Sequence, residues 1–387
     1  MSLSGLVDTS QQWNDSALRS DSVAFPVFPD DARDLQLVMG NRGLLACLAE
    51  IRELRRRCGQ EDDLTTEPEY FIAANTVENK RCAAVLIRRN RQLEACVLFY
   101  EHTRLGVGLG LFRGGDYMGE SLVVAPEGLR LHYVHLATQV LLKRWRIHGV
   151  SLTVKAPVDS CIQVMGPQTN ARRLSTAEIK HTLPLARTYE GLLARLGPRT
   201  RRSLAGKRQQ LEKSANVQFV PALDPDQALE VMLALEAKSI RQRATKFYHA
   251  RYRLLRVNSD FFSMGLRMPN GPWLSILTGW RRNGVTYVDL QMNDMNYKRE
   301  SISAVMRAYM LEHEIARKQE MVNFVSGCSM LLARYCEPVE TGTHVFIWKP
   351  GLRAKCLEMA ATRVRPGTVY ERAKTGAEFQ VCSDTDA

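Results

Sequence analysis

Residues 285–310 read VTYVDLQMNDMNYKRESISAVMRAYM, and they predict a strand, a polar loop and a helix in that order. We expect the strand over 285–292, where side chains of alternating polarity follow one another. We expect the helix from about Ile302 to Arg317, because apolar residues recur there at helical spacing. The unpaired amide groups at the start of such a helix can bind a phosphate.

A second alternating run lies upstream of this stretch, over 273–280. Asn283-Gly284 connects the two runs. Asn-Gly readily adopts the positive backbone angles of a type I′ turn, so the two runs predict a β-hairpin. A buried strand is expected after the helix, over 321–325.

The first half of the chain follows the same plan. Its expected strands, 83–88 and 93–100, are followed by a glycine-rich section, a helix over about 131–145 and a strand over 150–155. Arg-Arg-Asn begins the turn of both hairpins, at residues 88–90 and again at 281–283. We therefore predict a duplicated α/β unit.

Four segments follow from this interpretation. They are a flexible N-terminal arm over 1–34, a first module over 35–185, a second module over 186–365 and a C-terminal tail over 366–387. The second module is expected to begin with an arginine-rich helix over 198–213.

Composition limits the classes of protein that fit. The chain has 387 residues, of which 45% are hydrophobic and 24% charged, and these values exclude a disordered or collagen-like chain. No run is long and apolar enough for a membrane span and no signal pattern opens the chain, so we expect a cytoplasmic protein. The nine cysteines form no C-x-x-C pair and imply neither a disulfide framework nor a zinc ribbon.

The formal net charge of +12 admits three anionic partners, namely nucleic acid, an anionic membrane face or a cofactor that carries phosphates. Basic residues cluster in the helix over 198–213, and clustered guanidinium groups bind phosphates. We predict an anion-binding surface formed by Arg199, Arg201, Arg202, Lys207 and Arg208. A solvated helix face is the alternative, and the absence of neighbouring aromatic residues does not favour nucleic acid.

The same region resembles a known family. Residues 189–196 read YEGLLARL, residues 199–204 read RTRRSL, and Leu211-Glu212 ends the basic helix. This order of a hydrophobic helix and an arginine-rich helix resembles the CelD/BcsL-type acyltransferases of the GNAT superfamily, which are related to FemAB-type aminoacyl ligases. Further pieces of the pattern occur in order at 235–239, 288–306 and 324–327, so the resemblance covers roughly residues 80–365.

The resemblance implies an α/β fold with two tandem GNAT-like modules, each a central, mostly antiparallel sheet flanked by helices. It implies transfer of an acyl group from acetyl-CoA or another acyl-CoA to an amine or hydroxyl of a sugar, glycan or other small acceptor, with the chemistry in the second module. The chain departs from the family pattern at residues 301–304, which contain no glycine, and after Gly327, where no lysine follows.

Two other functions stay open at this point. One is a non-catalytic GNAT-fold protein that contacts nucleic acid or a membrane. The other is a FemAB-like transferase that uses aminoacyl-tRNA as the donor.

Acyl transfer needs a base for the acceptor and an acid for the leaving thiolate. We predict Asp289, Asp294 and Tyr297 at the reaction centre, with Glu236 and Tyr335 as further candidates. The donor phosphates are expected at Lys298, Arg299, Ser301 and Ser303. No metal site is predicted, because His132 and His135 stand three apart on a helix without an evident third ligand.

Overall fold

The computed structural model describes residues 33–348, except 62, 76–79, 105–106, 115–121, 144–146, 155, 157–159, 162–171, 240–244, 298–299, 326–327 and 338–339. The predicted arm lies outside the described residues up to residue 32, and the predicted tail lies outside them entirely. Lys298, Arg299 and Gly327 also lie outside them.

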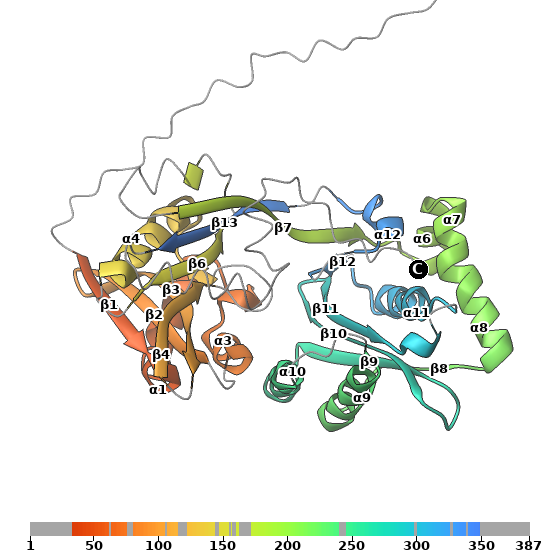
Figure 1. Cartoon of the computed structure of the whole chain (residues 1–387). Coiled ribbons are helices and arrows are strands. Elements are labelled where there is room, and N and C mark those ends of the chain that lie inside the picture. Colours follow the sequence, from red (N-terminus) through yellow and green to blue (C-terminus); the bar gives the residue numbers. More distant parts are fainter. Residues whose placement is uncertain are drawn as a thin grey trace, which may run out of the picture.

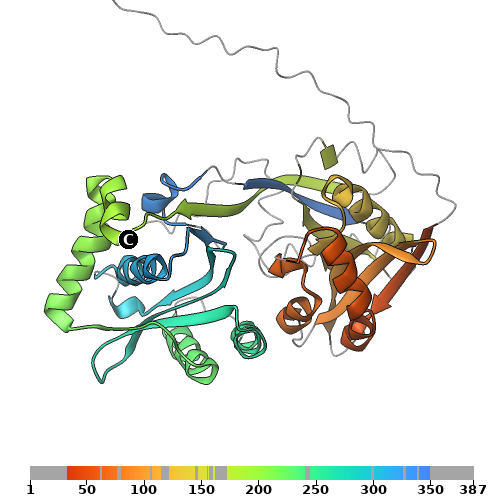
Figure 2. The ribbon, with the colours of Figure 1, turned by 180° about the vertical axis from the view of Figure 1, so that it is seen from behind.

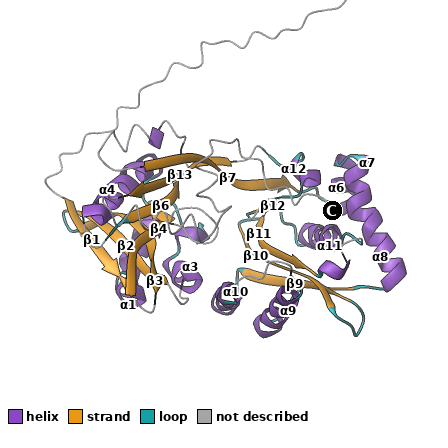
Figure 3. Ribbon diagram, in the orientation of Figure 1, coloured by secondary structure: helices purple, strands orange, loops and turns teal. Residues whose placement is uncertain are grey.

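One sheet runs through both halves of the chain in the order β1-β2-β3-β4-β6-β13-β7-β12-β11-β10-β9-β8, with β5 paired to β3 (Figures 1 and 3). The strands of the first half are β1 (Arg33–Met39), β2 (Lys80–Arg89), β3 (Gln92–Arg104), β4 (Val107–Gly114), β5 (Leu122–Val124) and β6 (Gly149–Val154). Those of the second half are β8 (Gln218–Val220), β9 (Phe261–Arg267), β10 (Trp273–Arg282), β11 (Val285–Asn293) and β12 (Met321–Phe324).

Two strands join the halves, namely β7 (Arg172–Pro184) and β13 (Glu340–Trp348). β7 pairs with β13 along its first part and with β12 along its last residues. β13 also pairs with β6, so a strand from the end of the described chain completes the sheet of the first half (Figure 1).

Helices cover both faces of the sheet (Figure 3). Those of the first half are α1 (Gly40–Ala46), α2 (Leu48–Arg57), η3 (Leu64–Thr66), α3 (Pro68–Asn75), η4 (Glu127–Leu129) and α4 (Arg130–Lys143). Those of the second half are α6 (Tyr189–Arg195), α7 (Pro198–Arg201), the π-helical η5 (Arg202–Gly206), α8 (Lys207–Ala215), α9 (Pro225–Ala237), α10 (Lys246–Val257), η6 (Met295–Tyr297), α11 (Ile302–Ala316) and α12 (Met330–Ala333).

The two hairpins have equivalent turns, as the repeated Arg-Arg-Asn predicts. Asn90 and Arg91 have φ values of 50° and 67°, and Asn283 and Gly284 have values of 49° and 74°. Each pair forms a two-residue turn, because Arg89 faces Gln92 and Arg282 faces Val285 in the registers of the strands. Positive φ at both central residues is the type I′ geometry.

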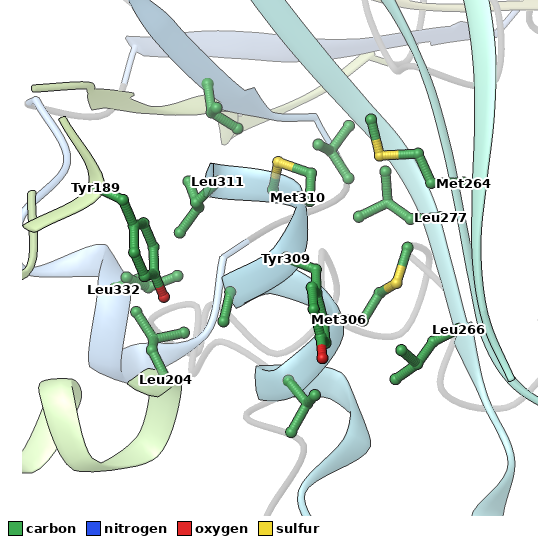
Figure 4. Close-up of a cluster of buried hydrophobic side chains, with 14 of the residues drawn as sticks. Tyr189, Leu204, Met264, Leu266, Leu277, Met306, Tyr309, Met310, Leu311 and Leu332 are labelled. Carbon is green, nitrogen blue, oxygen red and sulfur yellow. The ribbon is translucent and has the colours of Figure 1, made fainter. Parts of the chain in front are cut away.

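In the second half, α11 packs on one face of the sheet, and the segment 189–215 lies along the outer side of α11 (Figure 2). The core between them contains Tyr189 and Leu204 from this segment, Met306 and Tyr309 from α11, and Met264 from β9 (Figure 4). α9 and α10 cover the opposite face, where they pack on Ile276 and Leu290.

The first half contacts the second through η3 and α3. Tyr70 of α3 stacks on Phe261 of β9 with ring centroids 5.7 Å apart, and Leu64 and Trp280 belong to the same buried cluster. A polar contact adds to this interface, because the Arg282 guanidinium donates to Glu67 Oε2 at 3.4 Å.

Candidate functional site

The pairing of β11 with the parallel strand β12 covers only the first part of β11, because β12 ends at Phe324, and we call the unpaired side of β11 beyond this point the gap. They pair from Val285 opposite Met321 to Val288 opposite Phe324. Among the described strand pairs, none joins residues 289–293 of β11 to β12. The gap opens at the carboxyl ends of both strands, which is where ligands bind in open α/β sheets.

A β-bulge lies where this gap begins. In the register of β10 and β11, Thr278 faces Leu290 and Gly279 faces Val288, so Asp289 is an extra residue on β11. A bulge bends its strand and changes the direction of a side chain, and bulges often occur beside functional sites. The bulge requires glycine at position 279, because a Cβ atom there would lie 1.9 Å from the Tyr287 carbonyl oxygen.

Replacing Gly279 by alanine is expected to lower the free energy of unfolding by about 1–3 kcal/mol, because the added methyl group forces backbone shifts. Gly206→Ala is the matched control, since its Cβ would lie 3.5 Å from the nearest atom and alanine is preferred in helices. Urea unfolding of both variants tests this expectation. Equal unfolding midpoints would contradict it.

Asp289 is buried rather than exposed to a substrate. Its Oδ1 accepts a hydrogen bond from the Thr278 hydroxyl at 2.6 Å, and its Oδ2 lies 3.0 Å from Arg251 Nε of α10. The side chains of Arg251 and Asp289 are 4% and 2% exposed. Oδ1 is therefore hydrogen bonded, and Oδ2 forms an ion pair with Arg251 of α10 without an aligned hydrogen bond.

Asp294 is also buried, and it organises the loop after β11. Lys238 Nζ lies 2.6 Å from Asp294 Oδ2, and the Asn296 amide donates to Oδ1 at 3.0 Å. The Tyr297 amide donates to the Asp294 carbonyl at 3.1 Å, and its ring packs beside the core around α11. Glu236, the further candidate on α9, accepts a hydrogen bond from the Tyr248 hydroxyl. The carboxylates of Asp294 and Glu236 therefore already interact with groups of the protein itself.

The start of α11 faces the same edge of the sheet as the gap. Ser301 has a φ of 55°, and its carbonyl accepts from the amides of Ala304 and Val305 at 2.9 and 3.1 Å. Ile302 and Ser303 are the first residues of α11, and the amides of the first turn have no acceptor within the helix itself. These two amides and the helix dipole can hold a phosphate.

Two polar side chains lie between β11 and α11, next to the gap. Arg307 of α11 donates from Nε to Gln291 Oε1 at 2.9 Å, and Gln291 Nε2 donates to the Ser303 carbonyl at 3.0 Å. Arg307 also reaches toward the end of β12, where its guanidinium carbon lies 5.8 Å from the centre of the Phe324 ring. A guanidinium group, a carboxamide and the first amides of α11 therefore lie close together here, and groups of these kinds can bind phosphates and amides.

Tyr335 follows α12, which starts shortly after β12 ends. Its hydroxyl oxygen accepts a hydrogen bond from the Gly197 amide at 2.6 Å. The Gly197 amide, with smaller contributions from the Thr200 hydroxyl and the guanidinium groups of Arg334 and Arg201, holds the pKa of Tyr335 below its ordinary value. Sequence reasoning named Tyr335 only as a further candidate, because the contact with Gly197 joins residues far apart in the chain.

The predicted basic surface divides into two groups. Arg208 is used inside the fold, since it lies 2.8 Å from Glu212 and 2.6 Å from Glu312 and its guanidinium carbon is 4.0 Å from the centre of the Tyr309 ring. Lys207 donates to Gln210 at 3.3 Å. The other three are exposed, namely Arg199, Arg201 and Arg202.

Among the described residues, no group of three or more histidine, cysteine and acidic side chains could hold a metal ion. No helix in the described ranges is long and apolar enough to cross a membrane.

The sequence matches no protein-family model and no curated protein. Solved structures do match the fold. A tandem GNAT protein from the clavulanic acid biosynthesis pathway, solved without AcCoA, has a TM-score of 0.50 and 12% identity over 82% of this chain and 100% of its own. A conserved protein of unknown function from Bacteroides thetaiotaomicron VPI-5482 has a TM-score of 0.50 and 11% identity over 79% of this chain and 97% of its own.

A structure of FemX overlaps with a TM-score of 0.49 and 9% identity over 76% of this chain and 97% of its own. At these identities the likeness concerns the fold alone. The chain therefore has a tandem GNAT fold, which confirms the predicted fold class.

Proposed function

We propose that the chain is a GNAT-type acyltransferase that moves an acyl group from acetyl-CoA or another acyl-CoA to an amine or hydroxyl of a small acceptor. The main observation in support of this proposal is that the pairing of β11 with β12 ends beside the start of α11. The tandem GNAT fold supports it, since this gap has the strand-and-helix order that a phosphate-bearing donor needs.

The proposed roles follow from the contacts in the gap. The amides of Ile302 and Ser303 bind the donor phosphates, and Lys298 and Arg299, which precede α11 in the sequence, supply positive charge. Gln291 and Arg307 bind the donor arm through hydrogen bonds. The acceptor attacks the thioester carbonyl and loses its proton to solvent, the carbon–sulfur bond breaks, and Tyr335 gives its proton to the leaving thiolate and regains one from solvent. Asp289 holds the bulge in place and does not touch the donor.

The acceptor is proposed to be a sugar, glycan or other small molecule, as the resemblance to CelD/BcsL-type enzymes suggests. Arg199, Arg201 and Arg202 then bind an anionic group of the acceptor or donor, because their side chains are exposed.

Titration calorimetry with acetyl-CoA and with longer acyl-CoAs tests the proposal. We expect micromolar binding that Ser303→Asp weakens by about tenfold or more, because a carboxylate repels phosphates at a helix start. Ser214→Asp, an exposed position near the end of α8, is the control of equal charge and should bind normally. Absence of binding to every CoA tested would overturn the proposal.

A second candidate is a GNAT-fold protein that binds an anionic partner without catalysis. Two observations favour it, namely the lack of glycine at residues 301–304 and the hydrogen bond between Arg307 and Gln291, which occupies part of the gap. The same titration separates the candidates. Salt-sensitive binding of RNA without any CoA binding supports the second one. Transfer that needs aminoacyl-tRNA and no CoA supports a FemAB-like donor.

A further inference from the structure

Exposed arginines gather at the end of the second half where α6, α7 and α12 lie together (Figure 1). Two contacts join α7 to the α12 segment, because the Gly197 amide donates to the Tyr335 hydroxyl at 2.6 Å and the Thr200 hydroxyl donates to the Leu331 carbonyl at 3.2 Å. Segments far apart in the sequence therefore contribute to one surface. We call its five exposed arginines the arginine face, namely Arg195, Arg199, Arg201, Arg202 and Arg334.

The fold holds most of the arginine face on the outer side of one helical segment. Thr200, Leu204 and Leu211 of this segment are buried, and the two leucines belong to the core around α11. These buried residues fix which side of the segment faces inward. The arginines on the other side therefore remain exposed.

The charge of the arginine face is not balanced inside the described part of the protein. Arg208 of the same segment forms ion pairs with Glu212 and Glu312, whereas no ion pair between described residues involves the five arginines. Glu190 is the one acidic residue in the sequence from 187 to 211. A group of unpaired cations on an exposed surface attracts a partner with many negative charges.

We propose that the arginine face binds the surface of a membrane that contains anionic lipids. Its guanidinium groups lie on the outside of helices, so they can contact several lipid phosphates of an extended surface at the same time. Each arginine close to such a surface strengthens binding about fivefold. Five arginines together are therefore enough for a measurable interaction.

Nucleic acid is the other extended anion that a basic surface attracts, and the residues around the arginine face favour it less. Tyr189 is the one aromatic residue in the sequence from 187 to 215, and its side chain is buried. The Tyr335 hydroxyl is bonded to Gly197. Single-stranded bases need exposed rings on which to stack, and lipid head groups do not.

The contact with the membrane is electrostatic. Leu192, Leu196 and Leu204 are buried in the protein, so these side chains do not enter the bilayer. Binding by charge without insertion is reversible, and salt weakens it. The contact needs no acyl donor, so it goes beyond the proposed acyl transfer and each can fail without the other.

Flotation of the full-length protein with lipid vesicles tests the proposal. We expect it to float with vesicles of equal parts phosphatidylcholine and phosphatidylglycerol, to stay behind with phosphatidylcholine alone, and to be released by high salt. The triple variant Arg199→Gln, Arg201→Gln, Arg202→Gln should bind the anionic vesicles about 100-fold more weakly.

A second triple variant, Arg104→Gln, Arg256→Gln, Arg317→Gln, is the matched control. It loses the same charge at exposed positions on other elements, so it should bind the anionic vesicles like the unmodified protein. Equal weakening in both triple variants would show an effect of net charge alone and overturn the proposal. Absence of flotation with anionic vesicles would also overturn it, and salt-sensitive RNA binding in that case would assign the arginine face to nucleic acid.

Discussion

Replacing Tyr335 by phenylalanine is expected to lower kcat of the proposed acyl transfer by about 10²–10⁴-fold, because the leaving thiolate loses its proton donor. KM for the acyl-CoA should change little, since the phenol hydroxyl contacts Gly197 rather than the start of α11. Steady-state release of the CoA thiol measures both quantities. Tyr252→Phe removes a hydroxyl that bonds to Asp226 and Arg256 on the surface, and it serves as the control.

The pH dependence of the rate gives a second readout for Tyr335. A general acid works only while it is protonated, so the rate should fall as the pH rises through the pKa of Tyr335. The Gly197 amide lowers this pKa, so the fall should begin below the pH at which an ordinary tyrosine ionises. Tyr335→Phe should lack this alkaline decline. A variant that keeps the wild-type rate and pH profile would exclude Tyr335 as the acid.

The parts of the fold that the sequence predicts well depend on local signals. Asn283-Gly284 allows positive φ at both turn positions, and the turn occurs where these residues stand. At the start of α9, Asp224 accepts a hydrogen bond from the Gln227 amide and Pro225 is the first helical residue, and both are common residues for these positions. Each of these features needs only a few adjacent residues, so a single sequence is enough to recognise it.

The parts that the sequence could not predict depend on contacts between distant residues. Alternation along β11 puts Asp289 on one face with Tyr287 and Gln291, but the bulge at Asp289 breaks the alternation. Arg251, which neutralises Asp289, comes from a different element, and no spacing indicates this pair. The basic helix predicts Arg208 as part of an anion-binding surface, but in the structure Arg208 pairs with Glu312, which lies 104 residues away.

The neighbours of the last described strand also could not be predicted from the sequence. Residues 340–348 follow the second unit in the sequence, and their alternation predicts no particular neighbour. In the structure they form β13, which lies between β6 and β7. Strand order across two halves is fixed by packing of the complete sheet, and that information is not contained in any short stretch.

Replacing Asp289 by alanine is expected to lower the free energy of unfolding by about 3–5 kcal/mol, because it removes the carboxylate that forms an ion pair with the buried guanidinium of Arg251. The Thr278 hydroxyl also loses the carboxylate oxygen to which it donates. Asp226→Ala, at an exposed carboxylate that accepts a hydrogen bond from Tyr252, is the control and should cost at most about 1 kcal/mol. Chemical denaturation of both variants gives the comparison.

The double variant Arg251→Met with Asp289→Leu separates a buried ion pair from a catalytic base. Removing both charges together relieves the unpaired cation, so the double variant should recover most of the stability that Asp289→Ala loses. If Asp289 were instead a base that acts on the acceptor, Asp289→Ala would lower the rate of transfer and leave the unfolding free energy close to that of the control. Because the two side chains are almost fully buried against α10, we expect the loss to appear in stability.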